Sequence, residues 1–182
     1  NVTELRKCTI DLLRNGYSIT PERQITVAFS KPYLRNLQDL VVKKDSDISS
    51  FKQMKNYELG MQTGSTAEQW YETKQDVLHA KKTVLYDTIS NSFLDLNAGR
   101  IQGILLDEVY ADYYIAHMAK SSEYKVIQND RVPMDLFAVG MRKGDKTLRQ
   151  KVNQGLARLQ KNGQLRKLNE KWFGRNNSRL GK

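Results

Sequence analysis

The sequence predicts an α/β fold with two lobes, and two observations lead to this prediction. Short aliphatic and β-branched runs alternate with stretches of helical character, which is typical of α/β architecture, and we expect mainly parallel strands. Two strand-like runs that end in basic residues, 39–44 (DLVVKK) and 136–143 (LFAVGMRK), bracket an acidic middle segment. We interpret these runs as a paired hinge, through which the chain leaves one lobe and later returns to it.

Seven runs are expected to form strands and three stretches to form helices. The strands are short apolar runs bounded by polar or glycine-containing segments, at residues 10–13, 40–42, 59–62, 83–86, 104–106, 125–127 and 137–141. The helices are expected at residues 66–74, 89–97 and 108–119. Gly99 follows the second helix where a glycine commonly ends a helix. The middle segment therefore predicts a β-α-β-α-β-α-β unit of domain size.

The C-terminal part is expected to form amphipathic helices with a basic outer face. Apolar residues recur at helical spacing, at Leu148, Val152, Leu156, Leu159, Leu165, Leu168 and Trp172. Residues 132–182 carry 13 basic and 3 acidic side chains, whereas residues 39–131 carry 11 and 14, so the net charge of +10 is concentrated at the C-terminus. A solvated helix face explains this pattern, and so does an electrostatic partner such as an anionic membrane surface or an acidic protein.

Several classes of site are disfavoured by the composition. The single cysteine, Cys8, cannot form an internal disulfide, and we interpret it as a thiol of the core or its boundary. His79 and His117 are far apart, are expected on helical stretches and form no ligand cluster, so we predict no metal and no cofactor. No apolar run approaches the ~20 residues of a membrane span, and any export signal is expected to have been removed or never to have existed.

Two stretches could bind charged ligand groups. TGST at residues 63–66 lies between an expected strand and helix, where small residues can leave backbone N–H groups free for an anion, although an ordinary helix cap explains it equally well. It lacks the lysine of a nucleotide P-loop. Asp107 and Glu108 follow the apolar run ILL, where an acid can hold a cationic amine or merely cap the next helix. Arg23 could clamp a carboxylate or be a surface residue after Pro21.

Six ordered motifs decide among these interpretations. SITPERQITVAFSKPY, DLVVKKDSDI, GMQTGST, GRIQGILLDE, AVGMRKGD and LQKNGQLRKLNEKWFG resemble, in order and spacing, the polar amino acid-binding proteins of bacterial ABC importers, solute-binding protein family 3. The resemblance covers residues 10–174. It implies a type II periplasmic-binding-protein-like fold, with residues 1–38 and 132–182 in lobe 1 and residues 39–131 in lobe 2.

The resemblance also implies one wall of a ligand site in lobe 1. Arg23 would hold the α-carboxylate of an amino acid, with Gly16 and Ser18 beside it. Complete family members begin with further strands and helices of lobe 1 that have no counterpart here. We therefore expect an incomplete lobe 1 with an unpaired sheet edge, which favours dimers or swapped assemblies.

The second wall is implied in lobe 2. Gly64, Ser65 and Thr66 would face the carboxylate and the pocket, and Asp107 would take the α-ammonium group. Gln62 matches a position that tends to vary with the preferred ligand side chain. Which amino acid binds stays open.

The expected function is therefore that of an extracytoplasmic solute-binding component of an ABC transporter. It would capture a polar amino acid and deliver it to a membrane permease, in the periplasm or outside the cell, with a lipid anchor in the precursor as one option. It would not be an enzyme. A ligand-sensing receptor domain and a dehydratase-type enzyme on the same fold are the alternatives. A nucleic-acid-binding module is disfavoured, because Trp172 and Phe173 fall where the helical pattern places core residues.

Overall fold

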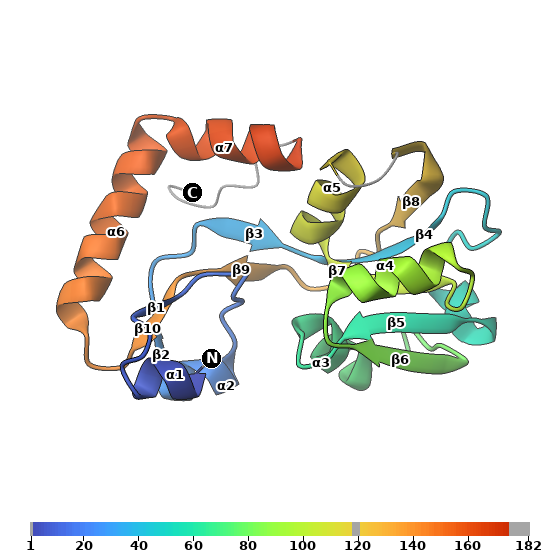
Figure 1. The fold of residues 1–182 in the computed structure, drawn as a ribbon, viewed down its shortest axis with the longest axis horizontal. Coiled ribbons are helices and arrows are strands. Elements are labelled where there is room, and N and C mark those ends of the chain that lie inside the picture. The colour runs from blue at the N-terminus through green and yellow to red at the C-terminus, as the bar shows by residue number, and fades with distance from the viewer. Residues whose placement is uncertain (1, 118–120, 175–182) are drawn as a thin grey trace. The chain divides into compact units, whose positions relative to one another are not determined.

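The computed structural model describes residues 2–117 and 121–174, and the chain divides into two compact units. Unit 1 combines residues 1–36 with residues 134–182, and unit 2 consists of residues 37–133. The sequence analysis set these boundaries after residues 38 and 131, two residues away in each case. Helices and strands alternate along the chain (Figure 1), so the α/β class is confirmed.

Unit 2 is built on a five-stranded sheet with the strand order β6-β5-β7-β4-β8. Its strands are β4 (Gln38–Lys43), β5 (Glu58–Gln62), β6 (Lys82–Tyr86), β7 (Gly103–Asp107) and β8 (Tyr124–Ile127). β5 pairs parallel with β6 and β7, whereas β4 pairs antiparallel with β7 and β8. The expectation of mainly parallel pairing is thus wrong around β4. This strand carries the chain into the unit and runs opposite to the others, which helical crossovers connect.

The helices of unit 2 lie between its strands along the chain. They are the 3₁₀-helix Phe51–Asn56, α3 (Thr66–Thr73), α4 (Ile89–Asn97), α5 (Glu108–His117) and a 3₁₀ turn at Ser121–Glu123. Ser65 and Thr88 cap α3 and α4 with their hydroxyls, and Gly99 has a φ of +73° just after α4, as expected. The expected helix end at residue 119 lies outside the described residues. His79 was expected on a helix but lies in the exposed connection before β6.

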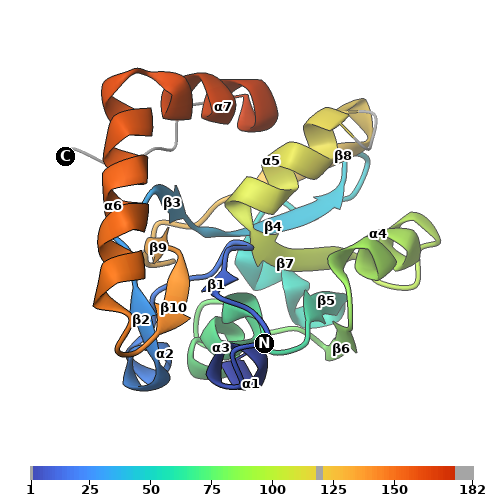
Figure 2. The same ribbon diagram turned by 60° about the vertical axis from the view of Figure 1, so that its left-hand side comes forward.

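Helices pack on both faces of the unit 2 sheet (Figure 2), and the burial of β4 between them explains why its LVV run carries no polar residue. Leu40 and Val42 pack into one core cluster with Phe51 of the 3₁₀-helix and with α3. Val41, which points to the opposite face, packs with Phe93 of α4 and with residues of β7 and α5. All five of these side chains are at most 1% exposed. A strand buried on both faces reads as a continuous apolar run.

Unit 1 contains smaller sheets, all of whose pairings are antiparallel. Strands β1 (Leu12–Leu13), β10 (Gly140–Arg142) and β2 (Val27–Phe29) form a sheet in the order β1-β10-β2, and β3 (Leu34–Asn36) pairs with β9 (Asp135–Phe137). The expected strand 10–13 is therefore shorter than predicted. The expected strand 137–141 is two strands, because the chain leaves the β3 pairing at Phe137 and joins the second sheet only at Gly140.

The expected pairing of the two hinge runs is also wrong. Residues 38–43 lie inside the sheet of unit 2 as β4, and residues 135–137 pair with β3 within unit 1. The paired strands next to the two crossing points are thus β3 and β9. A strand-like run predicts a strand but not its partner, which the register of the whole sheet decides.

The helices of unit 1 are α1 (Val2–Arg6), α2 (Pro21–Thr26), α6 (Lys146–Lys161) and α7 (Gln164–Phe173). Cys8 was expected in or near the core but is exposed, because it lies in the turn after α1 with a φ of +60°. Gly163, with a φ of +74°, separates α6 from α7. None of the described helices is both long and apolar enough to span a bilayer.

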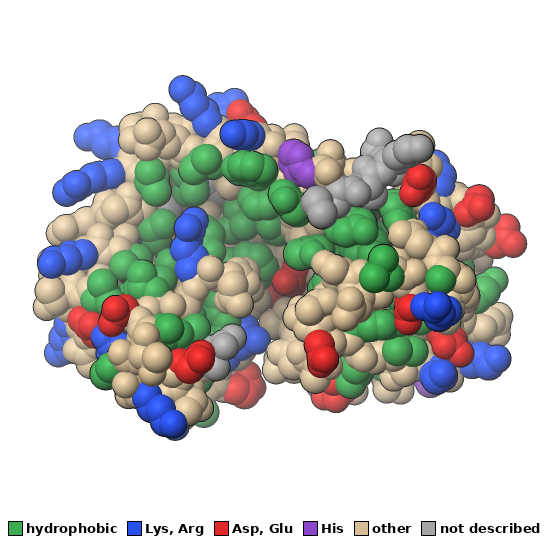
Figure 3. Space-filling view, in the orientation of Figure 1, with side chains coloured by type: hydrophobic (Ala, Val, Ile, Leu, Met, Phe, Trp, Pro, Cys, Tyr) green, Lys and Arg blue, Asp and Glu red, His purple; other side chains and the backbone are tan. Residues whose placement is uncertain are grey.

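The two C-terminal helices bear out the amphipathic pattern only in part. Leu156 of α6 and Leu165 of α7 are buried, whereas Leu168 and Trp172 are 45% and 41% exposed. The expectation that Trp172 belongs to the core is therefore wrong: helical periodicity marks an apolar face but not whether something covers it. Lysine and arginine side chains project from α6 and α7 at the left and top of Figure 3, with no ion pair among the described residues except Arg166 with Glu170.

Candidate functional site

The unit 2 half of the candidate site lies at one edge of the five-stranded sheet. Gln62 ends β5 and Asp107 ends the neighbouring β7, as the sequence predicted. Because β4 runs antiparallel to β7, its first residue, Gln38, lies directly opposite Asp107 in the register. This edge therefore brings together side chains from three adjacent strands, and the turn that leads from β5 into α3 begins there.

Gln38 links two of the predicted site residues, and the sequence analysis missed it. Its Nε2 donates to Asp107 Oδ1 at 2.8 Å and to Thr66 Oγ1 at 3.2 Å. Gln38 is only 4% exposed, and within the described part of the chain its Oε1 has no hydrogen-bond partner. The sequence offered no signal for Gln38, because its two partners lie 28 and 69 positions away.

The turn at residues 63–66 is a well-formed helix start. Gly64 has a φ of +69°, which favours glycine, and Ser65 Oγ accepts from Glu68 N at 3.2 Å. The Gly64 N–H donates to the Glu68 carboxylate, and the Ser65 N–H donates to Gln62 O. The expectation that these two N–H groups are free for an anion is therefore wrong, because Glu68 already closes the turn.

A second glutamine bridges acidic groups on the other face of β4. Gln128 Nε2 lies 3.4 Å from both Asp39 Oδ2 and Glu108 Oε1, and the two acids are 1% exposed. Consecutive residues of a strand point to opposite faces, so this group is separate from the one around Gln38. We assign it a structural role, because it satisfies buried acceptors beneath the start of α5.

The unit 1 half centres on Arg23. Arg23 belongs to α2, whose cap Thr20 accepts from Arg23 N at 3.2 Å. Its guanidinium carbon lies 4.5 Å from the centre of the Tyr17 ring, and Nη1 donates to Ser18 O at 3.0 Å. No described carboxylate forms an ion pair with Arg23. The ring and the carbonyl thus hold a planar fork of donors in a fixed orientation.

Ser18, whose carbonyl accepts from Arg23, and Gly16 both stabilise the fold of unit 1. Ser18 is 1% exposed, and its hydroxyl donates to Asp135 Oδ2 at 2.7 Å. Gly16 has a φ of +69°, and a Cβ there would lie 3.2 Å from the Phe137 ring, so a side chain at this position would be strained and crowded. Of the trio predicted from the sequence, Ser18 thus contacts Arg23 through its carbonyl, and Gly16 packs against Phe137.

Asp135 is a second residue that the sequence analysis missed. Burial raises the pKa of the Asp135 carboxyl above its ordinary value, and hydrogen bonds from Ser18 and Asn36, with the charge of Arg23, offset part of that rise. Its Oδ1 is buried and has no hydrogen-bond partner among the described residues. Asp135 lies 117 positions after Ser18, so no local pattern could have connected them.

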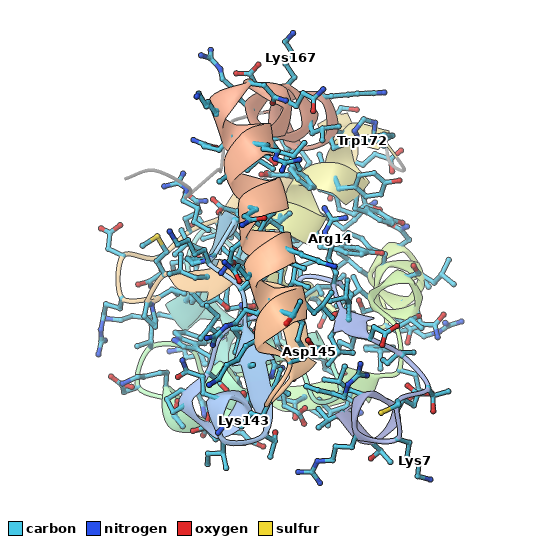
Figure 4. All side chains as sticks on the ribbon, turned by 90° about the vertical axis from the view of Figure 1, so that its left-hand side faces the viewer. Lys7, Arg14, Lys143, Asp145, Lys167 and Trp172 are labelled. Atoms are coloured by element: carbon cyan, nitrogen blue, oxygen red, sulfur yellow. The ribbon has the colours of Figure 1, made fainter. Side chains whose placement is uncertain are left out.

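A hollow in unit 1 is lined by none of the predicted site residues. A hollow of about 480 Å³ in unit 1 lies between β2 and the start of α6, where Figure 4 labels Lys143 and Asp145, but it contains none of the predicted site residues. In the described part of the chain, no three His, Cys, Asp or Glu side chains lie together as metal ligands would. Each half of the candidate site thus offers donors or acceptors for charged groups and no metal-binding cluster.

The sequence and the fold are similar to those of known proteins. A sequence model of the bacterial extracellular solute-binding proteins, family 3, matches residues 1–175. An ABC uptake transporter substrate-binding protein from Streptococcus pneumoniae, whose crystal structure contains bound histidine, is 39% identical with a TM-score of 0.86, and the match covers 97% of this chain and 73% of that one.

Two further relatives extend the comparison. A polar amino acid ABC uptake transporter substrate-binding protein from Streptococcus thermophilus is 42% identical with a TM-score of 0.63, over 98% of this chain and 69% of that one. ABC transporter arginine-binding protein 1 of Escherichia coli K12 is 30% identical over 168 residues, which make up 90% of this chain and 66% of the relative. The chain thus spans 66–73% of the length of these three proteins.

Proposed function

The chain belongs to the bacterial extracellular solute-binding proteins, family 3, and from this membership we propose that it captures a free polar amino acid for an ABC transporter. The E. coli relative is an arginine-binding protein, and the S. pneumoniae structure contains histidine. Both ligands carry the α-carboxylate and α-ammonium groups that the predicted residues would recognise. The observation that carries the proposal is the Asp107 carboxylate, which lies at a strand end and shares the Gln38 amide with Thr66.

The residues divide the ligand between the two units. Arg23, with Gly16 and Ser18 supporting it, takes the α-carboxylate from unit 1, because a guanidinium fork matches a carboxylate bidentately. In unit 2, Asp107 takes the α-ammonium group. The turn of Gly64 and Ser65, together with Thr66 and Gln62, surrounds the rest of the ligand.

The protein acts by binding alone and breaks no bond in the ligand. It works outside the cytoplasmic membrane, either in the periplasm or attached to the cell surface by a lipid, and it delivers the amino acid to a membrane permease. The basic outer face of α6 and α7 serves as a solvated surface of unit 1. No cofactor takes part.

Identification of a co-purifying ligand tests this function. The protein is purified without added amino acids and denatured, and the released small molecules are identified by mass spectrometry. Calorimetry with L-arginine, L-histidine and L-cystine then gives affinities. We expect one amino acid at near-stoichiometric amount, and much less of it from Asp107→Ala purified in parallel. A protein that releases nothing and binds no member of an amino acid panel contradicts the proposal.

We also propose that unit 1 self-associates through the outer strand of its sheet. Strand β1 has two residues and pairs on one side with β10, and Leu12 on it is 40% exposed. An uncovered sheet edge beside exposed apolar residues favours pairing with another chain. Light scattering at increasing protein concentration should show dimers, and Leu12→Lys should shift them to monomers. A parent protein that stays monomeric throughout removes this part of the proposal.

A further inference from the structure

Gln38 forms hydrogen bonds to two of the predicted ligand-binding residues, Thr66 and Asp107. The carbonyl oxygen of its side-chain amide has no hydrogen-bond partner among the described residues. The side chain of glutamine offers two N–H donors and one carbonyl acceptor. Nε2 donates to Thr66 Oγ1 at 3.2 Å and to Asp107 Oδ1 at 2.8 Å, which engages both donors. Gln38 is 4% exposed, and no described residue donates to its Oε1. A buried acceptor without a donor is unfavourable, so this atom is poised to accept a hydrogen bond.

The orientation of this amide is determined by its surroundings. An ionised carboxylate only accepts hydrogen bonds, so the amide nitrogen and not its oxygen must face Asp107. A flipped amide would place Oε1 against Asp107 Oδ1, where two acceptors repel each other, and would lose the hydrogen bond to that carboxylate. The strand register supports the same arrangement, because Gln38 of β4 lies directly opposite Asp107 of β7. The carbonyl group of Gln38 is therefore held in one direction by its own planar amide.

The unused acceptor lies at the right distance from Asp107 for one shared ligand group. With Nε2 bonded to Oδ1, the planar amide places Oε1 roughly 3.5–5 Å from Oδ1. Two acceptors that bind the same tetrahedral ammonium group lie about 4.5 Å apart. A single ammonium, which has three donors and no acceptor, can therefore reach both oxygens.

We infer that Gln38 is a further ligand-binding residue, whose Oε1 accepts a hydrogen bond from the ligand ammonium that Asp107 also binds. This inference rests on the proposed function. Gln38 would at once orient the two side chains beside it and contact the ligand. Its contribution would be shared by all α-amino acids, because it recognises the ammonium group and not the side chain.

A pair of matched substitutions tests the inference. Gln38→Met keeps the length of the side chain but removes its hydrogen bonds. Gln128→Met makes the same change at Gln128, which bridges two buried acids on the opposite face of β4. By calorimetry with L-arginine and L-histidine, we expect Gln38→Met to lose about tenfold or more in affinity and Gln128→Met to stay within about twofold of the parent.

Analogues without the ammonium group identify the atom that Gln38 contacts. Gln38→Met should bind 5-guanidinopentanoic acid, the deamino analogue of arginine, as well as the parent does. Equal losses for L-arginine and this analogue would mean that Gln38 only positions Thr66 and Asp107, and would overturn the ammonium contact. Unchanged affinity of Gln38→Met for both amino acids would overturn any ligand role. A parent that binds no amino acid would instead reject the proposed function itself.

A second measurement needs no folded variant. The side-chain amide nitrogen of Gln38 can be followed by NMR in the parent protein as L-arginine or L-histidine is added. Hydrogen bonding at Oε1 polarises the amide, so we expect its nitrogen resonance to move downfield on binding, while that of Gln128 stays in place. A Gln38 amide resonance that does not respond to saturating ligand would contradict the inference.

Discussion

Units 1 and 2 hold their halves of the candidate site by different means. In unit 2, Gln38 and Asp107 lie on two paired inner strands of a five-stranded sheet, β4 and β7, which are buried on both faces. In unit 1, Arg23 lies on a six-residue helix, held by a cap, a ring and a single carbonyl.

This difference shows two ways in which a fold fixes the positions of side chains in a binding site. Register in a buried sheet places two side chains opposite each other with little freedom, because a slip of one residue would turn every side chain to the wrong face. A short capped helix relies on a few local contacts, each of modest strength. We therefore expect unit 2 to tolerate change at the edge of its sheet poorly, and unit 1 to respond mainly to the loss of specific polar groups.

The largest expected effect is on the core of unit 2. Phe93 is fully buried, stacks on Tyr114 with ring centres 3.6 Å apart and meets Tyr124 edge-on. Phe93→Ala should lower the free energy of unfolding by about 3–5 kcal/mol. The control is its neighbour on α4, Leu94, which is 63% exposed and whose change to Ala should cost about 0.5 kcal/mol or less.

Urea unfolding followed by tryptophan fluorescence measures this effect unit by unit. The chain has two tryptophans, Trp70 in unit 2 and Trp172 in unit 1. Trp70→Phe and Trp172→Phe backgrounds therefore report on one unit each. Phe93→Ala should shift the transition seen by Trp70 much more than the transition seen by Trp172. Equal shifts of both signals would show that the two units unfold together and would remove the contrast between them.

The next effect concerns Asp107 and tests the unit 2 half of the site. Asp107→Ala leaves the ligand ammonium without its carboxylate, and breaking such a charged pair costs about 3–5 kcal/mol. We expect a loss of at least about a hundredfold in amino acid affinity by calorimetry. Asp45, an exposed acid in the same unit, provides the control, since Asp45→Ala should bind as the parent does. Equal affinity of Asp107→Ala and the parent would end the assignment.

A smaller effect is expected for Arg23, which tests the unit 1 half. Arg23→Lys keeps the charge but loses the planar fork, and charge-assisted hydrogen bonds of this kind contribute about 1.5–3 kcal/mol each. We expect at least about a tenfold loss of affinity, equal across a panel of amino acids, with little change in the Tm of the ligand-free protein.

Arg14→Lys is the matched control for Arg23→Lys. Arg14, which is labelled in Figure 4, is an exposed arginine of the same unit and lies over the Tyr33 ring. Its substitution should leave the affinity unchanged. If Arg23→Lys binds the panel as the parent does, the carboxylate role must be abandoned.

The smallest effect is a pH dependence of stability in unit 1. Burial raises the pKa of Asp135, so the folded state binds its proton more tightly than the unfolded state does. The stability that this proton contributes is fully present below the ordinary pKa of about 4 and is lost as the pH rises through the raised folded pKa. Asp135→Asn cannot lose a proton. Its stability relative to the parent should therefore increase between about pH 4 and pH 7.

Urea unfolding at several pH values, with Trp172 as the reporter, measures this difference. Ser18→Ala sharpens the test, because it removes a hydrogen bond that lowers the pKa of Asp135. In that background the pH window of the effect should move upward. A difference between parent and Asp135→Asn that is the same at pH 4 and pH 7 would show that the carboxyl does not titrate in this range.

Local patterns predicted the features whose causes lie within a few residues. The strands at 59–62, 83–86 and 104–106 and the helix at 89–97 agree with the structure to within one residue at each end. Each is a periodic or apolar run with its own stop signals. Asp107 and Glu108 were singled out because they follow an apolar strand, at the end where ligands of α/β sheets collect. The ordered motifs identified the family and predicted the ammonium-binding role of Asp107.

The sequence by itself thus determined the α/β class, most element positions and, through its ordered motifs, the family. Only the tertiary structure decided that β4 lies between β7 and β8, that Gln38 meets Thr66 and Asp107, that Ser18 meets Asp135, and that Trp172 is 41% exposed. The physical reason is the same in each case. Strand partners, buried hydrogen bonds and the covering of an apolar face depend on groups that are many positions away in the sequence. The local periodicity of apolar residues cannot predict where those groups lie in the folded protein.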